Sequence, residues 1–404
     1  MTRPPLLTFD ELDVVENDII RYIQDNKNVT RKDVTEFLNL SRTKITTHLQ
    51  NLFSSGILEE IEELESTGGR PARILELKSD FCYVCGIALG ATSARISIAD
   101  FRGNILETAV ELISTSSRPE SVFAHILSVV EDLLDKLSIP AWKLSAFGVG
   151  VPAPINSETG KIDSPAIIPG WQEFSIHDFI QDRFSPIRVR VENDVDIMAI
   201  GEQAAGTGEN YDNFIVIKIA TGIGCGIICN GELYAGVAGY SGHIGHISID
   251  RNGPVCYCGN IGCLEKIAAG PAMVERALAA IERGESAILA EIARENNGNI
   301  STEDIKLAAS QGDRVSNDII VESGKHIGQV LATVVSFFNP GLIIINGGVS
   351  LIGPQLLTSI QRTVIDYSLP ISTRNLRLQL SEIGFEANHI GSVQLALQQL
   401  IRDK

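Results

Sequence analysis

The chain has 404 residues, of which 44% are hydrophobic and 21% charged, and its formal net charge is −17. This length suits two or three folded domains, and the composition excludes wholesale disorder. The negative charge argues against a protein that coats nucleic acid through its overall field, although a small basic surface can still bind DNA.

Two membrane-related features are missing from the sequence. No apolar run reaches the ~20 residues that a membrane-spanning helix requires. The N-terminus also lacks the charged start and hydrophobic stretch of a secretion signal. We therefore expect a cytoplasmic protein without membrane partners.

The N-terminal stretch up to Gly56 predicts three short helices. Apolar residues at helical spacing mark the first helix, which ends near Asn26. Thr30, with Asp33 three positions later, has the pattern of an N-cap for the second helix. Ser41 caps the third helix and Gly56 ends it. The apolar residues of the first helix are Val15, Ile19, Ile20 and Ile23.

The third predicted helix has one apolar stripe and one polar face. The stripe consists of Ile45, Leu49, Leu52 and Phe53. The polar face carries donors and cations but no carboxylate, and a helix of this size fits a major groove with its N-terminal residues near base edges. The predicted DNA-contacting residues on this face are Arg42, Thr43, Lys44, Thr46, Thr47 and Gln50.

A two-stranded ribbon is predicted from about Leu58 to Lys78. Its tip, STGGRPAR, places Arg70 and Arg73 where they can meet phosphates or a narrow minor groove. Three short helices followed by a ribbon make a winged helix-turn-helix, so we predict a DNA-binding domain over residues 1–78. The alternative is a helical adaptor or dimerisation module with a solvated polar face.

From Phe81 to Asp403, apolar strand-like runs alternate with amphipathic helices, which predicts an α/β architecture. Glycine-bearing turns follow three of the hydrophobic runs, at residues 87–92, 219–228 and 343–350. Such turns let backbone N–H groups approach phosphate or substrate oxygens. Each turn is a weak signal when taken alone.

Three of the seven cysteines fall in one glycine-rich segment that also contains two histidines. A zinc ion with four N or S ligands from the protein has no open position, so a site of this kind is structural. The alternative is a redox pair, but the two nearest cysteines are separated by one residue rather than two. The predicted zinc ligands are His246, Cys256, Cys258 and Cys263.

The remaining four cysteines lie in apolar strand-like runs. An odd total in a reducing compartment makes a disulfide framework an unsuitable interpretation. We interpret these four as buried strand residues. They are Cys82, Cys85, Cys225 and Cys229.

A series of motifs in a specific order resembles the ROK family, the repressor and sugar-kinase group of the actin-like/hexokinase fold. The motifs are GVGVPAPINSETG, VENDVDIMAIGE, ATGIGCGII, GHIGHISI, CYCGNIGCLE and FNPGLIIINGGVS. The resemblance covers almost the whole chain, and CYCGNIGCLE with the preceding histidine is its most specific part. It implies two α/β lobes over residues 79–404, a sugar in the cleft between them, and a zinc site within residues 243–265 that braces a sugar-contacting loop.

The resemblance also implies roles for single residues by position. Asn193 would hydrogen-bond sugar hydroxyls, and Asp194 would be the catalytic base of a kinase. Glu265 would accept from further hydroxyls, Gly222 would allow close backbone approach, and His246 would serve the metal and touch the sugar edge. Without the resemblance, Asn193 and Asp194 read more simply as a turn or helix cap after a strand.

Three stretches depart from the family pattern. Ala88 and Ala91 replace the Asp and the second Gly of the D-x-G-G-T phosphate turn, which argues against ATP and magnesium as cofactors. His243 stands where the family usually has the Glu of GEIGH, so a different hydroxyl pattern can be satisfied. Ile167 falls near a position that is often a polar sugar contact.

These features favour a sugar-responsive transcription factor, most simply a repressor of carbohydrate uptake or catabolism genes. A sugar or sugar phosphate would change the relative placement of winged helices in a homodimer or homotetramer bound to operator DNA. The second hypothesis is an ATP-dependent sugar kinase with a DNA-binding appendage, which Asp194 supports and Ala88 opposes. The third is a sugar-independent regulator with a vestigial cleft, which only His243 and Ile167 support.

Overall fold

The computed structural model describes residues 5–62, 73–156, 159–162 and 168–402. The chain divides into two compact units, each with its own sheet. The first unit comprises Met1–Ala153, Thr159–Asp194 and Gly391–Lys404, and the second comprises Pro154–Glu158 and Val195–Ile390. Of the residues singled out above, Arg70 and Ile167 lie outside the described ranges.

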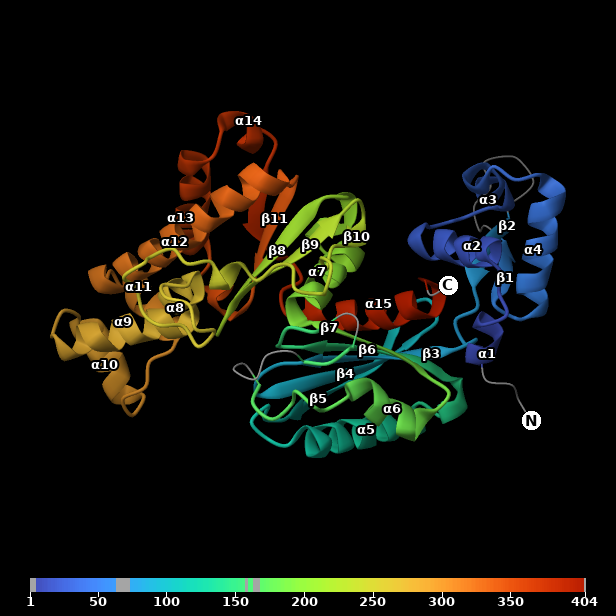
Figure 1. The fold of residues 1–404 in the computed structure, drawn as a ribbon, viewed down its shortest axis with the longest axis horizontal. Helices are drawn as coiled ribbons and strands as arrows, with labels where there is room; N and C mark the ends of the chain where they lie inside the picture. Colours follow the sequence, from blue (N-terminus) through green and yellow to red (C-terminus); the bar gives the residue numbers. More distant parts are fainter. Residues whose placement is uncertain (1–4, 63–72, 157–158, 163–167, 403–404) are drawn as a thin grey trace. The chain divides into compact units, whose positions relative to one another are not determined.

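A small helical module followed by a two-stranded ribbon begins the first unit (Figure 1). Asp13, Thr30 and Ser41 cap three of its helices through their side chains, and Gly56 ends the last with a φ of 79° that favours glycine. The predicted helices and ribbon are confirmed, and α1 is an additional helix. The elements are α1 Pro5–Phe9, α2 Val14–Asp25, α3 Arg31–Leu38, α4 Arg42–Ser54, β1 Leu58–Glu62 and β2 Arg73–Leu77.

The rest of the first unit is an α/β lobe built on a five-stranded sheet of order β5-β4-β3-β6-β7. Its first three strands along the chain pair antiparallel, and β6 and β7 then add in parallel. The elements are β3 Tyr83–Leu89, β4 Ser93–Asp100, β5 Ile105–Leu112, α5 Pro119–Lys136, η1 Ala141–Lys143, β6 Leu144–Val151, α6 Ile176–Phe184 and β7 Arg188–Asn193.

Helix α15, Glu386–Arg402, brings the end of the chain back to this lobe. A Cβ on Gly148 would lie 2.1 Å from the Ser392 carbonyl oxygen, so α15 approaches β6 as closely as only glycine permits. Leu397 and Ile401 of the same helix share one hydrophobic core with the helices of the N-terminal module. The module and the lobe are therefore packed together through the last helix of the chain.

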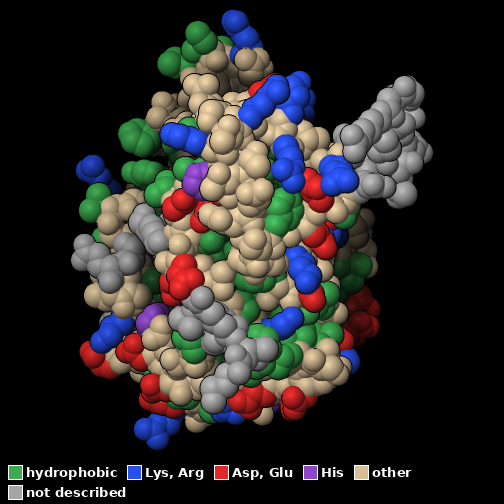
Figure 2. Space-filling model, turned by 90° about the vertical axis from the view of Figure 1, so that its right-hand side faces the viewer, with side chains coloured by type: hydrophobic (Ala, Val, Ile, Leu, Met, Phe, Trp, Pro, Cys, Tyr) green, Lys and Arg blue, Asp and Glu red, His purple; other side chains and the backbone are tan. Residues whose placement is uncertain are grey.

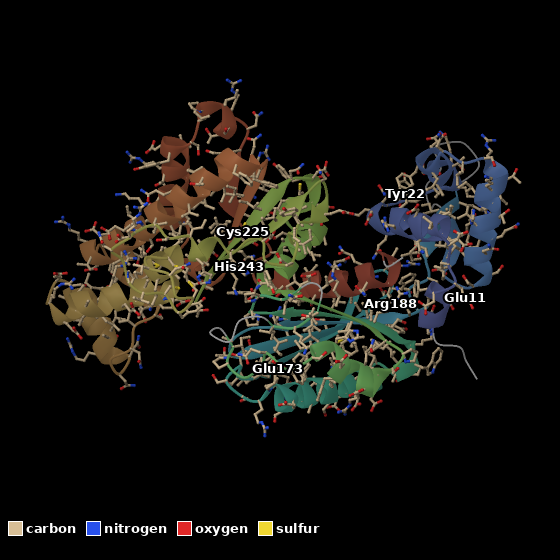
Figure 3. All side chains as sticks on the ribbon, in the orientation of Figure 1. Glu11, Tyr22, Glu173, Arg188, Cys225 and His243 are labelled. Atoms are coloured by element: carbon tan, nitrogen blue, oxygen red, sulfur yellow. The ribbon has the colours of Figure 1, made fainter. Side chains whose placement is uncertain are left out.

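Arg188 adds polar contacts to the same junction. Its guanidinium donates to the carbonyl oxygens of Gln399 and Leu400 at 2.9 and 3.0 Å, and to the carboxylate of Asp10 at 2.6 Å. Figure 3 labels Arg188 near Glu11, which follows α1. One arginine thus joins β7, α15 and the start of the module.

The second unit repeats the strand pattern in the order β10-β9-β8-β11-β12, with an antiparallel β8–β9–β10 meander and parallel β11 and β12. Two α/β lobes of one topology are therefore present, as expected. The elements are α7 Asp194–Ala205, η2 Thr207–Asn210, β8 Phe214–Ile219, β9 Ile223–Cys229, β10 Glu232–Leu233, η3 Ile244–His246, α8 Leu264–Ala268, α9 Gly270–Glu282, α10 Ala287–Glu295, α11 Thr302–Ser310, α12 Arg314–Phe338, β11 Leu342–Asn346, η4 Gly348–Ile352, α13 Pro354–Tyr367, α14 Pro370–Thr373 and β12 Arg377–Leu380.

Helices cover both faces of this second sheet. One hydrophobic core joins the sheet to residues of α8, α9, α12 and α13, and a separate core joins its other face to α7. Strand β11 is accordingly buried along its whole length. A parallel strand covered on both faces typically has a continuous apolar sequence, and the first four residues of β11 are LIII.

Candidate functional site

Helix α4 presents the predicted DNA-contacting face to solvent. Ile45, Leu49 and Leu52 are buried on the opposite side. The hydroxyls of Thr46 and Thr47 donate to backbone carbonyls one turn earlier, at 2.8 and 3.2 Å, so on this face they are free to act as acceptors rather than donors. All six predicted contact residues are exposed, namely Arg42, Thr43, Lys44, Thr46, Thr47 and Gln50.

The described part of the ribbon holds its arginine in an ion-pair network. Arg73 is exposed and donates to Glu60 at 3.1 Å, and Arg31 of α3 donates to the same carboxylate at 2.7 Å. Burial tends to raise the pKa of Glu60, but the two guanidinium hydrogen bonds outweigh it and lower that pKa. Figure 2 looks onto the side of the molecule that carries the module and shows Lys and Arg side chains across its upper part.

The four predicted metal ligands come together in the second unit. One ligand atom from each of His246, Cys256, Cys258 and Cys263 lies within 4.8 Å of the others. The Sγ atoms of Cys258 and Cys263 are 3.7 Å apart, and Cys256 Sγ is 3.7 Å from His246 Nδ1. Tetrahedral bonds of about 2.3 Å to sulfur and about 2.1 Å to nitrogen place neighbouring ligand atoms about 3.6 to 3.8 Å apart. The cluster therefore has the spacing of a tetrahedral metal site.

Without an ion, burial keeps two of the cysteines of the cluster as neutral thiols. Burial raises the pKa of Cys263 to about 12 and raises the pKa of Cys256. At Cys258, burial by itself would raise the pKa. Hydrogen bonds, of which the strongest comes from the Asn260 backbone N–H, outweigh burial and lower the pKa. Metal binding deprotonates thiols, so a bound ion would supply the positive charge that these sulfurs need as thiolates.

The backbone around the cluster is tightly folded. The Cys256 N–H donates to the Asn260 carbonyl at 2.7 Å, and Ser248 forms a β-bridge with Cys263. Gly262 has a φ of 68°, and a Cβ there would lie 1.6 Å from the Asp250 carbonyl oxygen. Only glycine can occupy this position, so the glycines of the segment serve the geometry of the ligands.

Tyr257 is a further partner of the cluster that was not predicted from the sequence. Its hydroxyl lies 3.3 Å from His246 Nε2, while His246 Nδ1 faces Cys256. An outer hydrogen bond of this kind fixes the tautomer and orientation of a metal-binding histidine. The signal was its position between two ligands in the CYC tripeptide.

Glu265 follows the last cysteine of the cluster and turns back to β9. Its Oε2 accepts a hydrogen bond from the Ile223 N–H at 2.8 Å, and the residue is only 9% exposed. A Cβ on Gly222 would lie 2.6 Å from that oxygen. Gly222 therefore makes room for the Glu265 carboxylate, which gives a structural reason for the glycine.

His243 lies in the turn that runs beside β9, near Cys225 (Figure 3). The Cys225 N–H donates to the Gly242 carbonyl at 2.9 Å, which fixes this turn. The His243 Nε2 atom is buried and has no hydrogen-bond partner among the residues the structure describes. Burial, followed by the neighbouring His246, lowers the pKa of His243. The side chain is therefore a neutral imidazole at neutral pH with one unused polar atom.

Asn193 and Asp194 mark the change from β7 to α7 in the first unit. Asn193 donates from Nδ2 to the Ala153 carbonyl at 2.9 Å, and Asp194 is 7% exposed. Gly222, His243, His246 and Glu265 belong to the second unit. Within the second unit, Gly222 contacts Glu265, and the rings of His243 and His246 lie 6.4 Å apart. Asn193 and Asp194 lie at a strand-to-helix junction, where Asn and Asp are common.

Ala88 gives the predicted phosphate turn no acidic side chain. It lies near the end of β3, paired with Gly150 of β6 and Arg95 of β4, and it is 9% exposed. Ala91 is in the following turn, where its carbonyl accepts from the Thr115 N–H at 3.3 Å. Neither position offers an acidic group.

The cysteines outside the cluster are unpaired. Cys82, Cys85 and Cys225 are buried, as expected. Cys82 precedes β3 rather than lying within it, and Cys229, at the end of β9, is only half-buried. The prediction of a buried strand position is therefore wrong for Cys229, because β9 ends there at the turn to β10.

The fold and these sites define a two-lobed α/β protein with an N-terminal winged helix-turn-helix. Residues 84–399 match the ROK family, and residues 12–59 match a winged helix-turn-helix DNA-binding family. The chain belongs to the ROK family. Among the described residues, no helix is long and apolar enough to cross a membrane.

Two relatives that are named as transcriptional regulators align with nearly the full chain. The chain is 26% identical to the xylose repressor of Caldicellulosiruptor bescii over 385 residues, which cover 95% of each chain. It is 27% identical to the Escherichia coli transcriptional dual regulator NagC over 386 residues, 95% of this chain and 92% of the relative.

Solved structures of two kinds resemble this chain, namely a transcriptional regulator and sugar kinases. A ROK family transcriptional regulator, a homologue of the E. coli MLC protein, superposes with a TM-score of 0.82 at 26% identity and covers 96% of both chains. A ROK family glucokinase from Streptomyces griseus, in complex with glucose and AMPPNP, has a TM-score of 0.67 at 28% identity and covers 78% of this chain and 99% of its own. The regulator therefore matches a larger part of this chain than the kinase does.

Proposed function

We propose that this protein is a sugar-responsive transcriptional repressor that binds operator DNA through α4 and the ribbon. The observation that carries the proposal is the joint presence of an exposed, carboxylate-free face on α4 and a full-length likeness to ROK regulators. In this proposal, residues 1–78 form the DNA-binding domain and residues 79–404 form the sugar-binding domain. The protein acts as a homodimer or homotetramer in the cytoplasm. Two-fold symmetry would let paired helices read a pseudo-palindromic site.

Helix α15 supports a coupling between ligand and DNA. It begins in the second unit and ends in the first, where Leu397 and Ile401 share a core with the N-terminal module. A ligand can shift DNA affinity only if it binds two conformations differently. A helix whose residues are divided between both units and whose end packs on the N-terminal module is a suitable element for such a change.

The proposed sugar contacts are Asn193, Asp194, Gly222, His243, His246 and Glu265. The buried Nε2 of His243 supports this assignment, because a hydroxyl or an acidic group of a ligand would satisfy it. The proposed metal is zinc, held by His246, Cys256, Cys258 and Cys263, and its role is structural. When bound, the ion would fix the segment that carries His243 and Glu265.

A sugar-panel titration tests the effector role. The operator is the duplex that the full-length protein selects from a random pool, and its affinity is measured at one salt concentration with aldoses, N-acetylated sugars and their phosphates. We expect at least one of them to change the Kd for DNA by about tenfold, within the usual range of allosteric coupling. No shift with any member of the panel would contradict an effector role.

The same titration with Glu265→Gln locates the sugar. We expect the variant to keep its sugar-free DNA affinity and to lose most of the sugar response, because an amide replaces the charged acceptor. Glu285→Gln, which removes an exposed carboxylate paired with Arg283, is the matched control and should respond as the wild type does.

Kinase activity is the second candidate, because the glucokinase shares the lobes and the family resemblance implies a base role for Asp194. We expect no sugar-dependent ATP consumption above background in a coupled assay, since Ala88 supplies no acidic group to the phosphate turn. Sugar-dependent turnover that Asp194→Asn abolishes would reverse this conclusion and establish a kinase.

A further inference from the structure

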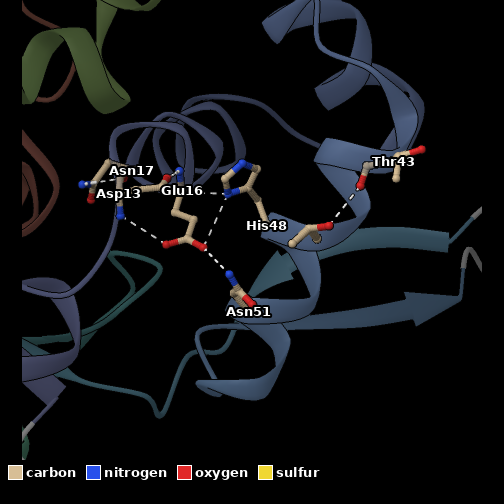
Figure 4. Close-up of polar contacts among 7 residues, drawn as sticks. Asp13, Glu16, Asn17, Thr43, His48 and Asn51 are labelled. Atoms are coloured by element: carbon tan, nitrogen blue, oxygen red, sulfur yellow. Dashed lines mark hydrogen bonds and ion pairs between the residues drawn. The ribbon is translucent and has the colours of Figure 1, made fainter.

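A second group of metal-ligating side chains lies in the N-terminal module (Figure 4). Asp13 and Glu16 stand at the N-terminal end of α2, and His48 projects from α4 toward them. His48 Nδ1 is 3.2 Å from Asp13 Oδ2 and 3.6 Å from Glu16 Oε1. One ligand atom from each of the three lies within 4.8 Å of the others.

The contact differs from an ordinary histidine–carboxylate hydrogen bond. His48 Nδ1 is buried and makes no hydrogen bond of acceptable geometry within the described residues, although two carboxylate oxygens face it. Ligands on a tetrahedral ion with bonds of about 2.1 Å lie about 3.4 Å apart. The two distances, 3.2 and 3.6 Å, bracket that separation.

The two carboxylates are already held in place by the helix cap. Asp13 Oδ1 accepts from the Glu16 N–H at 2.8 Å, and Glu16 Oε2 accepts from the Asp13 N–H at 3.2 Å. The other oxygen of each carboxylate is the one that faces His48. Asn51 of α4 donates to Glu16 Oε1 at 3.0 Å and steadies it further. The ligand set is thus preorganised, which lowers the cost of binding an ion.

We propose that Asp13, Glu16 and His48 bind a divalent transition-metal ion that ties α4 to the N-terminal end of α2. One imidazole and two carboxylates suit zinc or nickel better than calcium or magnesium, which take oxygen ligands. The Asp13 side chain is 54% exposed, so water can complete the coordination and the ion can exchange. The site is separate from the Cys/His cluster of the second unit.

Zinc stoichiometry tests the proposal on the full-length protein. After equilibrium dialysis against free zinc in the micromolar range and removal of loosely bound ion, metal analysis should find two zinc ions per wild-type chain. We expect Asp13→Asn and His48→Gln to bind one, with at least a tenfold loss of affinity for the second ion. Cys258→Ser should also bind one zinc ion, because it loses the Cys/His cluster and keeps the site on α2 and α4. The set of variants therefore shows which of the two sites fails.

Asp13→Asn is the more informative variant because asparagine caps helices as well as aspartate does. A folded variant that loses one zinc ion therefore reports a lost ligand rather than a lost helix. Asp18→Asn, which changes an exposed carboxylate of α2 outside the group, is the matched control and should bind two ions. If Asp13→Asn and His48→Gln both bind zinc as the wild type does, the group is an ion-pair cluster and the proposal is overturned.

Zinc-dependent stability provides a second readout. An ion that binds only the folded module raises its unfolding temperature, and the rise grows with ion concentration. We expect added zinc to raise the unfolding temperature of Cys258→Ser, in which the site on α2 and α4 is intact. The same addition should have no effect on Cys258→Ser combined with Asp13→Asn, and an equal rise in both would contradict the assignment.

Discussion

Replacing Arg42 and Lys44 of α4 by glutamate is expected to weaken DNA binding by about 100-fold or more at constant salt. Each contact to a base or phosphate is worth about 1 to 3 kcal/mol, and the new carboxylates add repulsion. Both side chains are exposed, and neither contributes to the core of the module, so the fold should persist. Fluorescence anisotropy with the selected duplex measures the change, and the slope of log K against log salt should fall by about two.

The control for this prediction is Lys27→Glu. Lys27 is an exposed residue of the same module, and it lies beside Glu76, Leu77 and Arg102 rather than on α4. The change in net charge per residue is the same, so a loss caused only by the overall field would appear in this variant too. DNA affinity within about twofold of the wild type for Arg42→Glu/Lys44→Glu would show that another surface reads the DNA.

Features that depend on residues close together in the chain could be predicted from the sequence. Thr30 and Ser41 cap their helices because a short side-chain acceptor precedes each helical run. The Cys/His cluster was predicted for the same reason, since three of its members lie within eight residues and glycines allow the chain to turn around them. In both cases the information is contained in one short segment.

Features that depend on distant parts of the chain could not be predicted in this way. Arg188 and Asp10 meet at 2.6 Å across 178 positions, and no local pattern pairs them. Gly148 lies within strand β6 and not in a turn. Glycine is required there because α15 packs so closely on β6 that a side chain would not fit. Periodicity shows that His48 is on α4, but not that the cap of α2 lies opposite it.

The proposed sugar site depends both on short motifs and on contacts between distant parts of the chain. The family resemblance implies sugar contacts at His243 and Glu265, and the structure adds that Glu265 and the neighbour of His243 hydrogen-bond to β9. Glu265 hydrogen-bonds Ile223, and Gly242 beside His243 hydrogen-bonds Cys225. The Cys/His cluster lies between these two residues in the chain, so its integrity should control both of them together.

If the proposed zinc site is correct, Cys258→Ser is expected to remove the ion of the Cys/His cluster and the sugar response while leaving DNA binding intact. Hydroxyl oxygen is a poor substitute for a thiolate ligand, and structural zinc contributes about 10 to 16 kcal/mol of apparent binding energy in small zinc domains. Losing the ion should release the segment between His243 and Glu265. The DNA-contacting module belongs to the first unit, so its affinity for the selected duplex should stay within about threefold of the wild type.

Cys229→Ser provides the matched comparison for this last prediction. It removes a half-buried thiol of the same unit that is not part of the cluster, and we expect it to keep both zinc and the sugar response. Metal analysis of protein dialysed without added zinc, followed by the sugar titration, separates the two variants. If Cys258→Ser retains as much zinc as the wild type does under this dialysis, the four residues are not zinc ligands. If it loses zinc but responds to sugar as the wild type does, the ion stabilises the second unit without organising the segment that carries His243 and Glu265.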